Sequence, residues 1–204
     1  MKEAIINSIF PTPIYMSKLD RKLTPLELKF VDKNKKDFCK NDGNITSKNN
    51  YILNEKPFFN IKKELDLSVK DYFKKVISPV DTITPYITQS WLNFTETNQF
   101  HHKHAHPNSL VSGVFYINCH EEFDKIKFFN DGYKTIKPET KTWNLWNAES
   151  WWFQVKTGDL IMFPSSLTHM VENKEGTNTR ISLAFNVFIK GTIGVNKSLT
   201  ELIL

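Results

Sequence analysis

Four of the six histidines in this sequence lie within six positions, in the stretch HHKHAH at 101–106. Side chains two residues apart on an extended strand point to the same face, so His102, His104 and His106 would share one face. Imidazoles gathered on a strand face can bind a divalent metal ion. One strand supplies two such ligands comfortably, and a third must come from elsewhere in the chain.

His169 is the obvious candidate for that third ligand. It ends the stretch GDLIMFPSSLTH, which has the pattern of a strand followed by a turn and would return the chain to the metal. The other interpretation is an exposed histidine-rich loop to which His169 is unrelated. The histidine spacing favours the metal site and leaves the loop open.

Arginine is the second unusual feature, because only two of the 27 basic residues, Arg21 and Arg180, are arginines. Arg180 begins the stretch RISLAFNVF, in which it shares one strand face with Ser182. A buried guanidinium needs an anionic partner, since an unpaired buried charge is very costly. That partner is either an Asp or Glu of the chain or a carboxylate ligand held by Arg180 and the Ser182 hydroxyl.

The core that must position these residues is predicted to be β. From about residue 85 to 190, short β-like runs alternate with turns, as in an antiparallel β-sandwich or jelly roll. Residues 131–150 form a long loop of the kind that often covers a binding site. The length favours one domain over 1–204, with an N-terminal part at 1–80 ahead of the core.

The N-terminal part should contribute one extended segment and two helices. Residues 4–18 look extended, and a helix over about 24–39 starts with a capping box at Thr24. Residues 41–50 are a polar loop. A second helix is expected over 57–77, where apolar residues recur every three or four positions. The expected class is therefore mainly β with flanking helices.

Composition bounds the remaining possibilities. Hydrophobic residues make up 40% and charged residues 24%, which is ordinary for a globular protein, and no apolar run has the length of a membrane span. No signal peptide is expected, and Cys39 and Cys119 form no CxxC, which suggests reduced thiols in a cytoplasmic protein. The net charge is +5, and its densest basic patch, at 33–40, favours a solvated helix face over a nucleic-acid site.

Taken together, the motifs resemble those of the iron- and 2-oxoglutarate-dependent oxygenases. The stretch 104–116 follows the pattern H-x-H-P-N-S-x-x-S-G-V-x-Y of a small group of such oxygenases from bacteria and phages. The resemblance covers roughly residues 85–190. It implies a double-stranded β-helix, a jelly roll with helices packed on one sheet. It also implies Fe(II), 2-oxoglutarate and O2 as reactants, with hydroxylation of a substrate and release of succinate and carbon dioxide.

The resemblance implies roles for individual residues. His104, His106 and His169 would bind the metal, while Arg180 and Ser182 would bind the far carboxylate of 2-oxoglutarate. Tyr116 would help to bind the co-substrate, and Asn93 and Asn186 would line the same pocket. Trp91 and the tryptophans near 143–152 would wall the substrate side, although aromatic residues in such places more often pack in a core.

One position departs from the family pattern. The wider superfamily uses two histidines and one carboxylate, and His106 stands at the acidic position. Three-histidine sites occur in β-barrel dioxygenases that do not use 2-oxoglutarate, so that class stays open, as does a non-catalytic metal-binding jelly roll. The ligand pair could also be His102 and His104. A peptide, a nucleobase and a small metabolite are all open as substrates, no membrane partner is expected, and a homodimer is left open.

Overall fold

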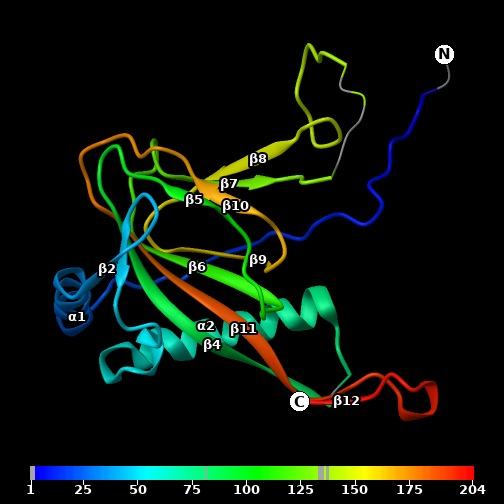
Figure 1. Ribbon diagram of the computed structural model, residues 1–204, viewed down its shortest axis with the longest axis horizontal. Helices are drawn as coiled ribbons and strands as arrows, with labels where there is room; N and C mark the ends of the chain where they lie inside the picture. The colour runs from blue at the N-terminus through cyan, green and yellow to red at the C-terminus, as the bar shows by residue number, and fades with distance from the viewer. Residues whose placement is uncertain (1–2, 81, 133–135, 137) are drawn as a thin grey trace.

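Two antiparallel sheets face each other in the computed structural model, which describes residues 3–80, 82–132, 136 and 138–204 (Figure 1). This arrangement confirms the expected mainly β jelly roll. The larger sheet has the strand order β1-β9-β6-β11-β4-β3-β2, and β12 pairs with β11 at its end. Its strands are β1 (Tyr15–Lys18), β2 (Phe38–Lys40), β3 (Ile45–Ser47), β4 (Ile83–Thr95), β6 (Val111–Asn118), β9 (Asp159–Pro164), β11 (Arg180–Ile193) and β12 (Leu202–Ile203).

The smaller sheet has the order β5-β10-β7-β8. Its strands are β5 (His101–His104), β7 (Lys125–Phe129), β8 (Ser150–Gln154) and β10 (His169–Val171). Side chains from both sheets meet in one buried cluster between them. Tyr116 and Phe163 come from the larger sheet, and Ile126 and Phe128 come from the smaller one. This cluster fixes the spacing of the two sheets.

Two α-helices cover the outer face of the larger sheet. The first, α1 (Pro25–Lys36), begins as expected, with Thr24 accepting from the backbone N–H of Glu27 and the Glu27 side chain accepting from the N–H of Thr24. The second, α2 (Phe59–Tyr72), packs its apolar stripe into a core shared with Leu92, Phe94, Leu183 and Phe185 of the sheet, and the buried residues of the stripe are Ile61, Leu65, Val69 and Tyr72.

The ends of the helices differ from the sequence expectation. The first helix stops at Lys36, because residues 38–40 pair with β3 as strand β2. Part of the expected polar loop is therefore a β-hairpin. The second helix is flanked by short turns of other types, 3₁₀ helices at Ile52–Asn54 and Lys56–Phe58 and a π-helical turn at Phe73–Ile77. A last 3₁₀ turn is Asn196–Ser198.

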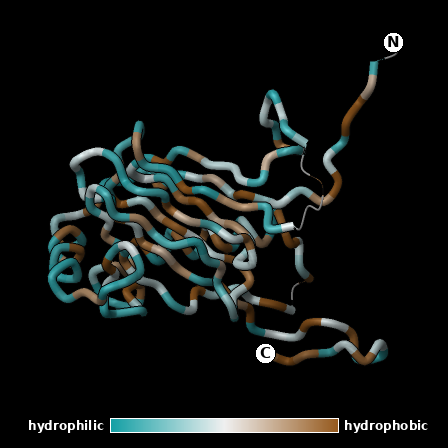
Figure 2. The backbone as a smooth tube through the Cα atoms, turned by 45° about the horizontal axis from the view of Figure 1, so that its top comes forward, coloured by the Kyte–Doolittle hydropathy of each residue, from teal (hydrophilic) through white to brown (hydrophobic). Residues whose placement is uncertain are grey.

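The N-terminal segment is extended but mostly unpaired. Only residues 15–18 join the sheet, and the prolines at 11 and 13, which lack a backbone N–H, precede them. Figure 2 shows hydrophobic stretches within the stacked strands and also in this segment, whose exposed apolar residues include Ile5, Ile6, Ile9 and Phe10. Among the described helices, none combines the length and apolarity needed to cross a bilayer.

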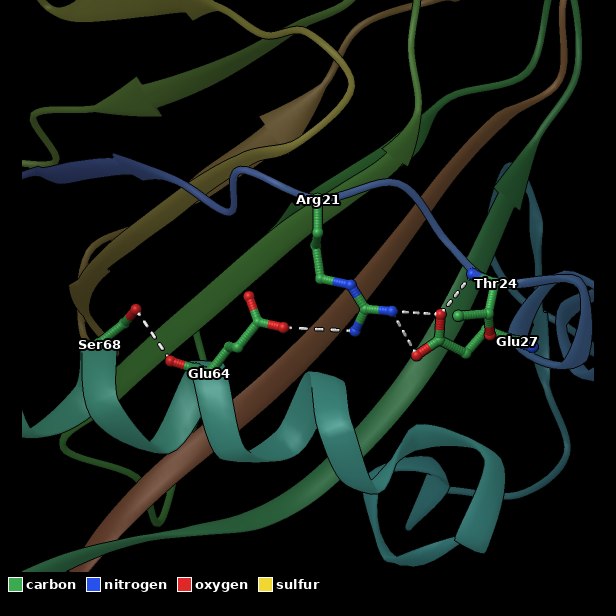
Figure 3. Close-up of polar contacts among 5 residues, drawn as sticks. All are labelled: Arg21, Thr24, Glu27, Glu64 and Ser68. Carbon is green, nitrogen blue, oxygen red and sulfur yellow. Dashed lines mark hydrogen bonds and ion pairs between the residues drawn. The ribbon is translucent and has the colours of Figure 1, made fainter.

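Arg21 ties the N-terminal segment to both helices (Figure 3). Its Nη2 donates to both carboxylate oxygens of Glu27, with the Oε1 contact at 2.8 Å, and its Nη1 lies 3.4 Å from Oε1 of Glu64. The Glu27 side chain is buried, so its charge is balanced by Arg21. One of the two arginines thus has a structural role in the scaffold behind the larger sheet.

Candidate functional site

The clustered histidines lie where β5 and β10 pair. His169 of β10 stands opposite His104, and Val171 stands opposite His101, so three steps along β5 match two along β10. This β-bulge breaks the simple alternation of side chains. His101 and His102 both stay close to His104, with ring centroids 4.7 and 4.8 Å from its ring. The sequence expectation that alternate residues share a face therefore holds only in part here.

His104, His106 and His169 form one compact group. Their possible ligand atoms lie within 4.8 Å of one another. The ring of His104 lies 4.4 Å from that of His169 and 4.8 Å from that of His106. Three imidazoles at this spacing, coming from two strands and a loop, are suited to a divalent metal ion.

Hydrogen bonds to backbone carbonyls orient two of these rings. Nδ1 of His104 lies 2.8 Å from the carbonyl oxygen of His102, and Nδ1 of His169 lies 3.1 Å from that of Leu167. A carbonyl can only accept, so each Nδ1 donates and each Nε2 keeps a free lone pair. This is the arrangement that outer hydrogen-bond partners give to metal-binding histidines.

Burial keeps these imidazoles neutral. It lowers the pKa of His106 to about 4 and that of His169 to about 3, and the neighbouring imidazoles add to both shifts. Burial also lowers the pKa of His104. Metal ions bind the neutral imidazole, so at neutral pH all three rings are in the form that a metal requires.

A buried polar chain joins the loop that carries His106 to the turn before β10. The backbone N–H of His106 donates to the carbonyl of Ser165 at 2.9 Å. The Ser165 hydroxyl lies 2.8 Å from those of Ser109 and Ser112, and Ser112 donates to Oδ1 of Asn186 at 2.9 Å. We call these four polar side chains the serine clasp. The clasp holds two histidine-bearing segments at a fixed separation.

Arg180 lies on the opposite wall, at the start of β11. It is only 4% exposed, and its Nη1 donates to the carbonyl of Lys125 at 3.2 Å. The guanidinium carbon lies 5.3 Å from the centroid of the Tyr116 ring, a cation–π contact. Among the described residues, no carboxylate pairs with Arg180. The structural salt bridge that the sequence left open is therefore absent from the described part of the chain.

Three polar residues lie side by side next to Arg180, on neighbouring strands. Ser182 of β11 stands opposite Asn93 of β4 on one side and Tyr116 of β6 on the other. Oδ1 of Asn93 and the hydroxyl of Tyr116 are buried without a hydrogen-bond partner. Burial raises the pKa of Tyr116, which keeps its hydroxyl protonated and able to donate. Orphaned buried polar atoms beside an unpaired arginine indicate a place for a polar, anionic ligand.

A single cavity connects the two walls. The histidine group and the arginine group both line it, and the lining residues include Trp91, Asn93, His101, His104, His106, His169, Arg180 and Ser182. The structure therefore brings together most residues that the sequence singled out. Tyr116 meets this group through the Arg180 contact rather than by lining the cavity.

Other expected residues have different surroundings. Asn186 accepts a hydrogen bond from Ser112 in the serine clasp and does not line the cavity. Trp143, Trp146 and Trp152 are exposed, so they pack in no core. His101 was not predicted from the histidine spacing, and it lines the cavity because of the β5 bulge. Its place next to His102 in the sequence was the only signal available.

Comparison with known proteins points to one family. Residues 89–186 match the family described as "Putative 2OG-Fe(II) oxygenase", where 2OG is 2-oxoglutarate. The matched segment runs from β4 to β11 and contains the histidine cluster and Arg180. None of the curated proteins compared with the chain matches it.

Solved structures share the fold at low sequence identity. An oxidoreductase of the 2OG-Fe(II) oxygenase family from Burkholderia pseudomallei is 14% identical, with 85% of this chain and 83% of that chain covered and a TM-score of 0.56. A prolyl-4-hydroxylase from Pseudomonas putida is 12% identical, with 86% and 92% covered and a TM-score of 0.54. A Trichoplax adhaerens prolyl hydroxylase, solved with a hypoxia inducible factor peptide, is 12% identical, with 86% and 83% covered and a TM-score of 0.58. Residues 89–186 are therefore similar to the 2OG-Fe(II) oxygenases, a family of oxidoreductases, and the chain shares the jelly-roll fold of these solved enzymes.

Proposed function

We propose that His104, His106 and His169 bind the iron(II) ion of this oxygenase. The proposal is supported by ligand atoms within 4.8 Å of one another and by two rings whose free nitrogen is fixed by a carbonyl partner. The donor set fits the metal, because imidazole is a good ligand for iron and all three rings are held neutral.

Arg180 and Ser182 would bind the far carboxylate of 2-oxoglutarate. A planar guanidinium can donate two parallel hydrogen bonds to a carboxylate, and Ser182 is the next residue along the same strand face. The Tyr116 hydroxyl and the Asn93 side chain lie on the strands at either side and lack partners of their own. A bound dianion would offset the cost of burying Arg180 without a carboxylate from the chain.

The proposed reaction combines the chemistry of the matched family with the histidine and arginine walls of the cavity. With metal, 2-oxoglutarate and O2 bound, the site would couple decarboxylation of 2-oxoglutarate to succinate with hydroxylation of a substrate C–H bond. Arg180 and Ser182 would hold the co-substrate at its far end. The Trichoplax enzyme was solved with a peptide, and HygX from Streptomyces hygroscopicus was solved with hygromycin B. Peptides and small metabolites, together with nucleobases, are therefore the substrate classes to screen.

The observation that carries the proposal is the shared cavity. One wall of this cavity carries three neutral imidazoles, and the other carries an unpaired arginine. Anaerobic titration of the purified protein with iron(II) and 2-oxoglutarate tests it. A weak visible charge-transfer band should appear only when both are present. No band in the wild type under saturating conditions would count against the proposal.

The three-histidine set supports a second candidate, a dioxygenase that does not use 2-oxoglutarate. A site of three neutral imidazoles lacks the negative charge that a carboxylate ligand would bring. His106→Asp separates the two candidates, because it restores the two-histidine, one-carboxylate set of the superfamily. If the first proposal is right, His106→Asp still binds iron and 2-oxoglutarate. If neither the wild type nor His106→Asp binds 2-oxoglutarate, the second candidate is favoured.

A further inference from the structure

Two groups of three histidines exist in this cluster, and they share one member. The first is the proposed iron site, and the second consists of His101, His102 and His104, whose possible ligand atoms also lie within 4.8 Å of one another. We propose that the second group is an alternative binding site for a borderline divalent metal such as zinc, which competes with the proposed iron site for His104. This inference rests on the proposed function only for the identity of the competing site.

The β5 bulge creates the second group. Without it, the adjacent residues His101 and His102 would point to opposite faces of the strand. In the structure their ring centroids lie 5.1 Å apart, and the rings of His101 and His104 are stacked at 4.7 Å. Nδ1 of His102 is buried and has no hydrogen-bond partner. An orphaned imidazole nitrogen among other imidazoles is a specific sign of a missing ligand, since buried polar groups are nearly always paired.

The hairpin of β2 and β3 supports His101 from behind. The Asn41 amide nitrogen lies 3.2 Å from Nε2 of His101 and can only donate, so Nε2 accepts and the neutral ring carries its proton on Nδ1. This contact holds the His101 ring in place, and a metal bound to His101 must displace it. The tip of this hairpin is fixed against the start of β5. The N–H of Phe100 donates to the carbonyl of Gly43 at 3.1 Å, and any Cβ at Gly43, where φ is +91°, would meet Phe100 at 2.6 Å.

Only one of the two sites can be filled at a time. Nδ1 of His104 is engaged by the carbonyl of His102, so His104 offers a single free nitrogen. The imidazole-only ligand set suits zinc, copper and nickel as well as iron. A metal at the second site must displace the contact between Asn41 and His101. The second site should therefore be the weaker one, and filling it should remove His104 from the proposed iron site.

Zinc binding by the double variant His106→Ala/His169→Ala tests the inference, because this variant removes the first group and leaves the second intact. We expect one equivalent of zinc per chain in competition with a chromophoric chelator. Adding His101→Ala and His102→Ala should weaken zinc binding at least about tenfold. Adding His120→Ala instead, the matched control outside both groups, should leave zinc binding unchanged. A folded double variant that binds no zinc, or that binds it equally without His101 and His102, would overturn the inference.

The double variant His106→Gln/His169→Gln carries the same test should the alanine variant unfold, since it keeps polar side chains of similar size at both positions. Circular dichroism reports whether each variant is folded. Failure of the proposed function would appear elsewhere, as normal iron(II) binding by His169→Ala. The two outcomes are therefore separable, because zinc binding is measured only in chains that lack the first group.

Discussion

The two arginines of the chain are both largely buried, and they have opposite surroundings. Arg21, behind the larger sheet, reaches two carboxylates, Glu27 and Glu64. Arg180, inside the jelly roll, is only 4% exposed, and in the described part of the chain it has a backbone carbonyl and an aromatic ring but no carboxylate.

This difference separates a scaffold region from a ligand region. Removing a guanidinium from water costs several kcal/mol unless an anion and hydrogen bonds compensate it. At Arg21 the chain provides that compensation itself. At Arg180 the proposed function leaves the compensation to a bound ligand, and the adjacent partnerless groups of Asn93 and Tyr116 would fit the same explanation. Substitutions in the scaffold should therefore change stability, and substitutions around the cavity should change binding.

The largest effect is expected from removing a histidine of the ligand region. His169→Ala should lower iron(II) affinity at least about a hundredfold, because loss of a ligand exceeds the cost of losing an outer partner. Competition with a chromophoric chelator measures it. His120→Ala is the control and should bind iron normally. Wild-type affinity in His169→Ala would remove this residue from the metal site.

The second largest effect is expected on 2-oxoglutarate affinity, and it compares substitutions of the two arginines. Arg180→Lys keeps the charge and loses the two-pronged donor, so 2-oxoglutarate binding should weaken by roughly 1.5–3 kcal/mol, which is about 10- to 150-fold. Iron binding should survive. Arg21→Lys, the matched control, should leave 2-oxoglutarate affinity unchanged. Calorimetry with metal-loaded protein provides both values, and equal affinities in the wild type and Arg180→Lys would contradict the assignment of Arg180.

The scaffold side of the comparison predicts a change in stability. Glu27→Gln removes the buried charge that pairs with Arg21 and leaves one side-chain oxygen to accept from both Arg21 and the N–H of Thr24. We expect the free energy of unfolding to fall by about 1–3 kcal/mol, as measured in urea. Iron and 2-oxoglutarate affinities should not change at a temperature where the variant is folded. A binding defect without loss of stability would mean that the two regions are not separate.

The smallest effect is expected at the serine clasp. Ser165→Ala removes hydroxyl contacts to Ser109 and Ser112 and should lower iron(II) affinity a few-fold, because the segments that carry His106 and His169 become less well positioned. Ser47→Ala is the control, since this serine is equally buried and makes two hydrogen bonds away from the cavity. Loss of stability in both variants with unchanged iron binding would leave the clasp a purely structural role.

The sequence predicted regular elements well and the histidine wall less well. Period-2 alternation placed Arg180 and Ser182 on one face of β11, and the capping box fixed the start of α1, because both depend on local patterns. The β5 bulge depends on the register with β10, more than sixty residues away in the sequence, so the place of His101 could not be read locally. The hairpin at 38–47 is short and polar, and its pairing likewise comes from the sheet that it joins.

The serine clasp explains residues of the 104–116 pattern to which the sequence analysis assigned no role. Ser109 and Ser112 belong to the clasp. Gly113 leaves room for the ring of Phe185, which any Cβ at this position would overlap. These contacts join three separate segments, 109–113, 165 and 185–186, and spacing along the chain carries no information about them.

In the proposed function, one cavity holds a metal on its histidine wall and 2-oxoglutarate on its arginine wall. The most direct test is the 2-oxoglutarate affinity of the wild type measured anaerobically with and without iron(II). Three neutral imidazoles leave the full charge of the ion for the dianion to offset, so we expect metal to strengthen 2-oxoglutarate binding at least about tenfold. The same 2-oxoglutarate affinity with and without metal would contradict the account.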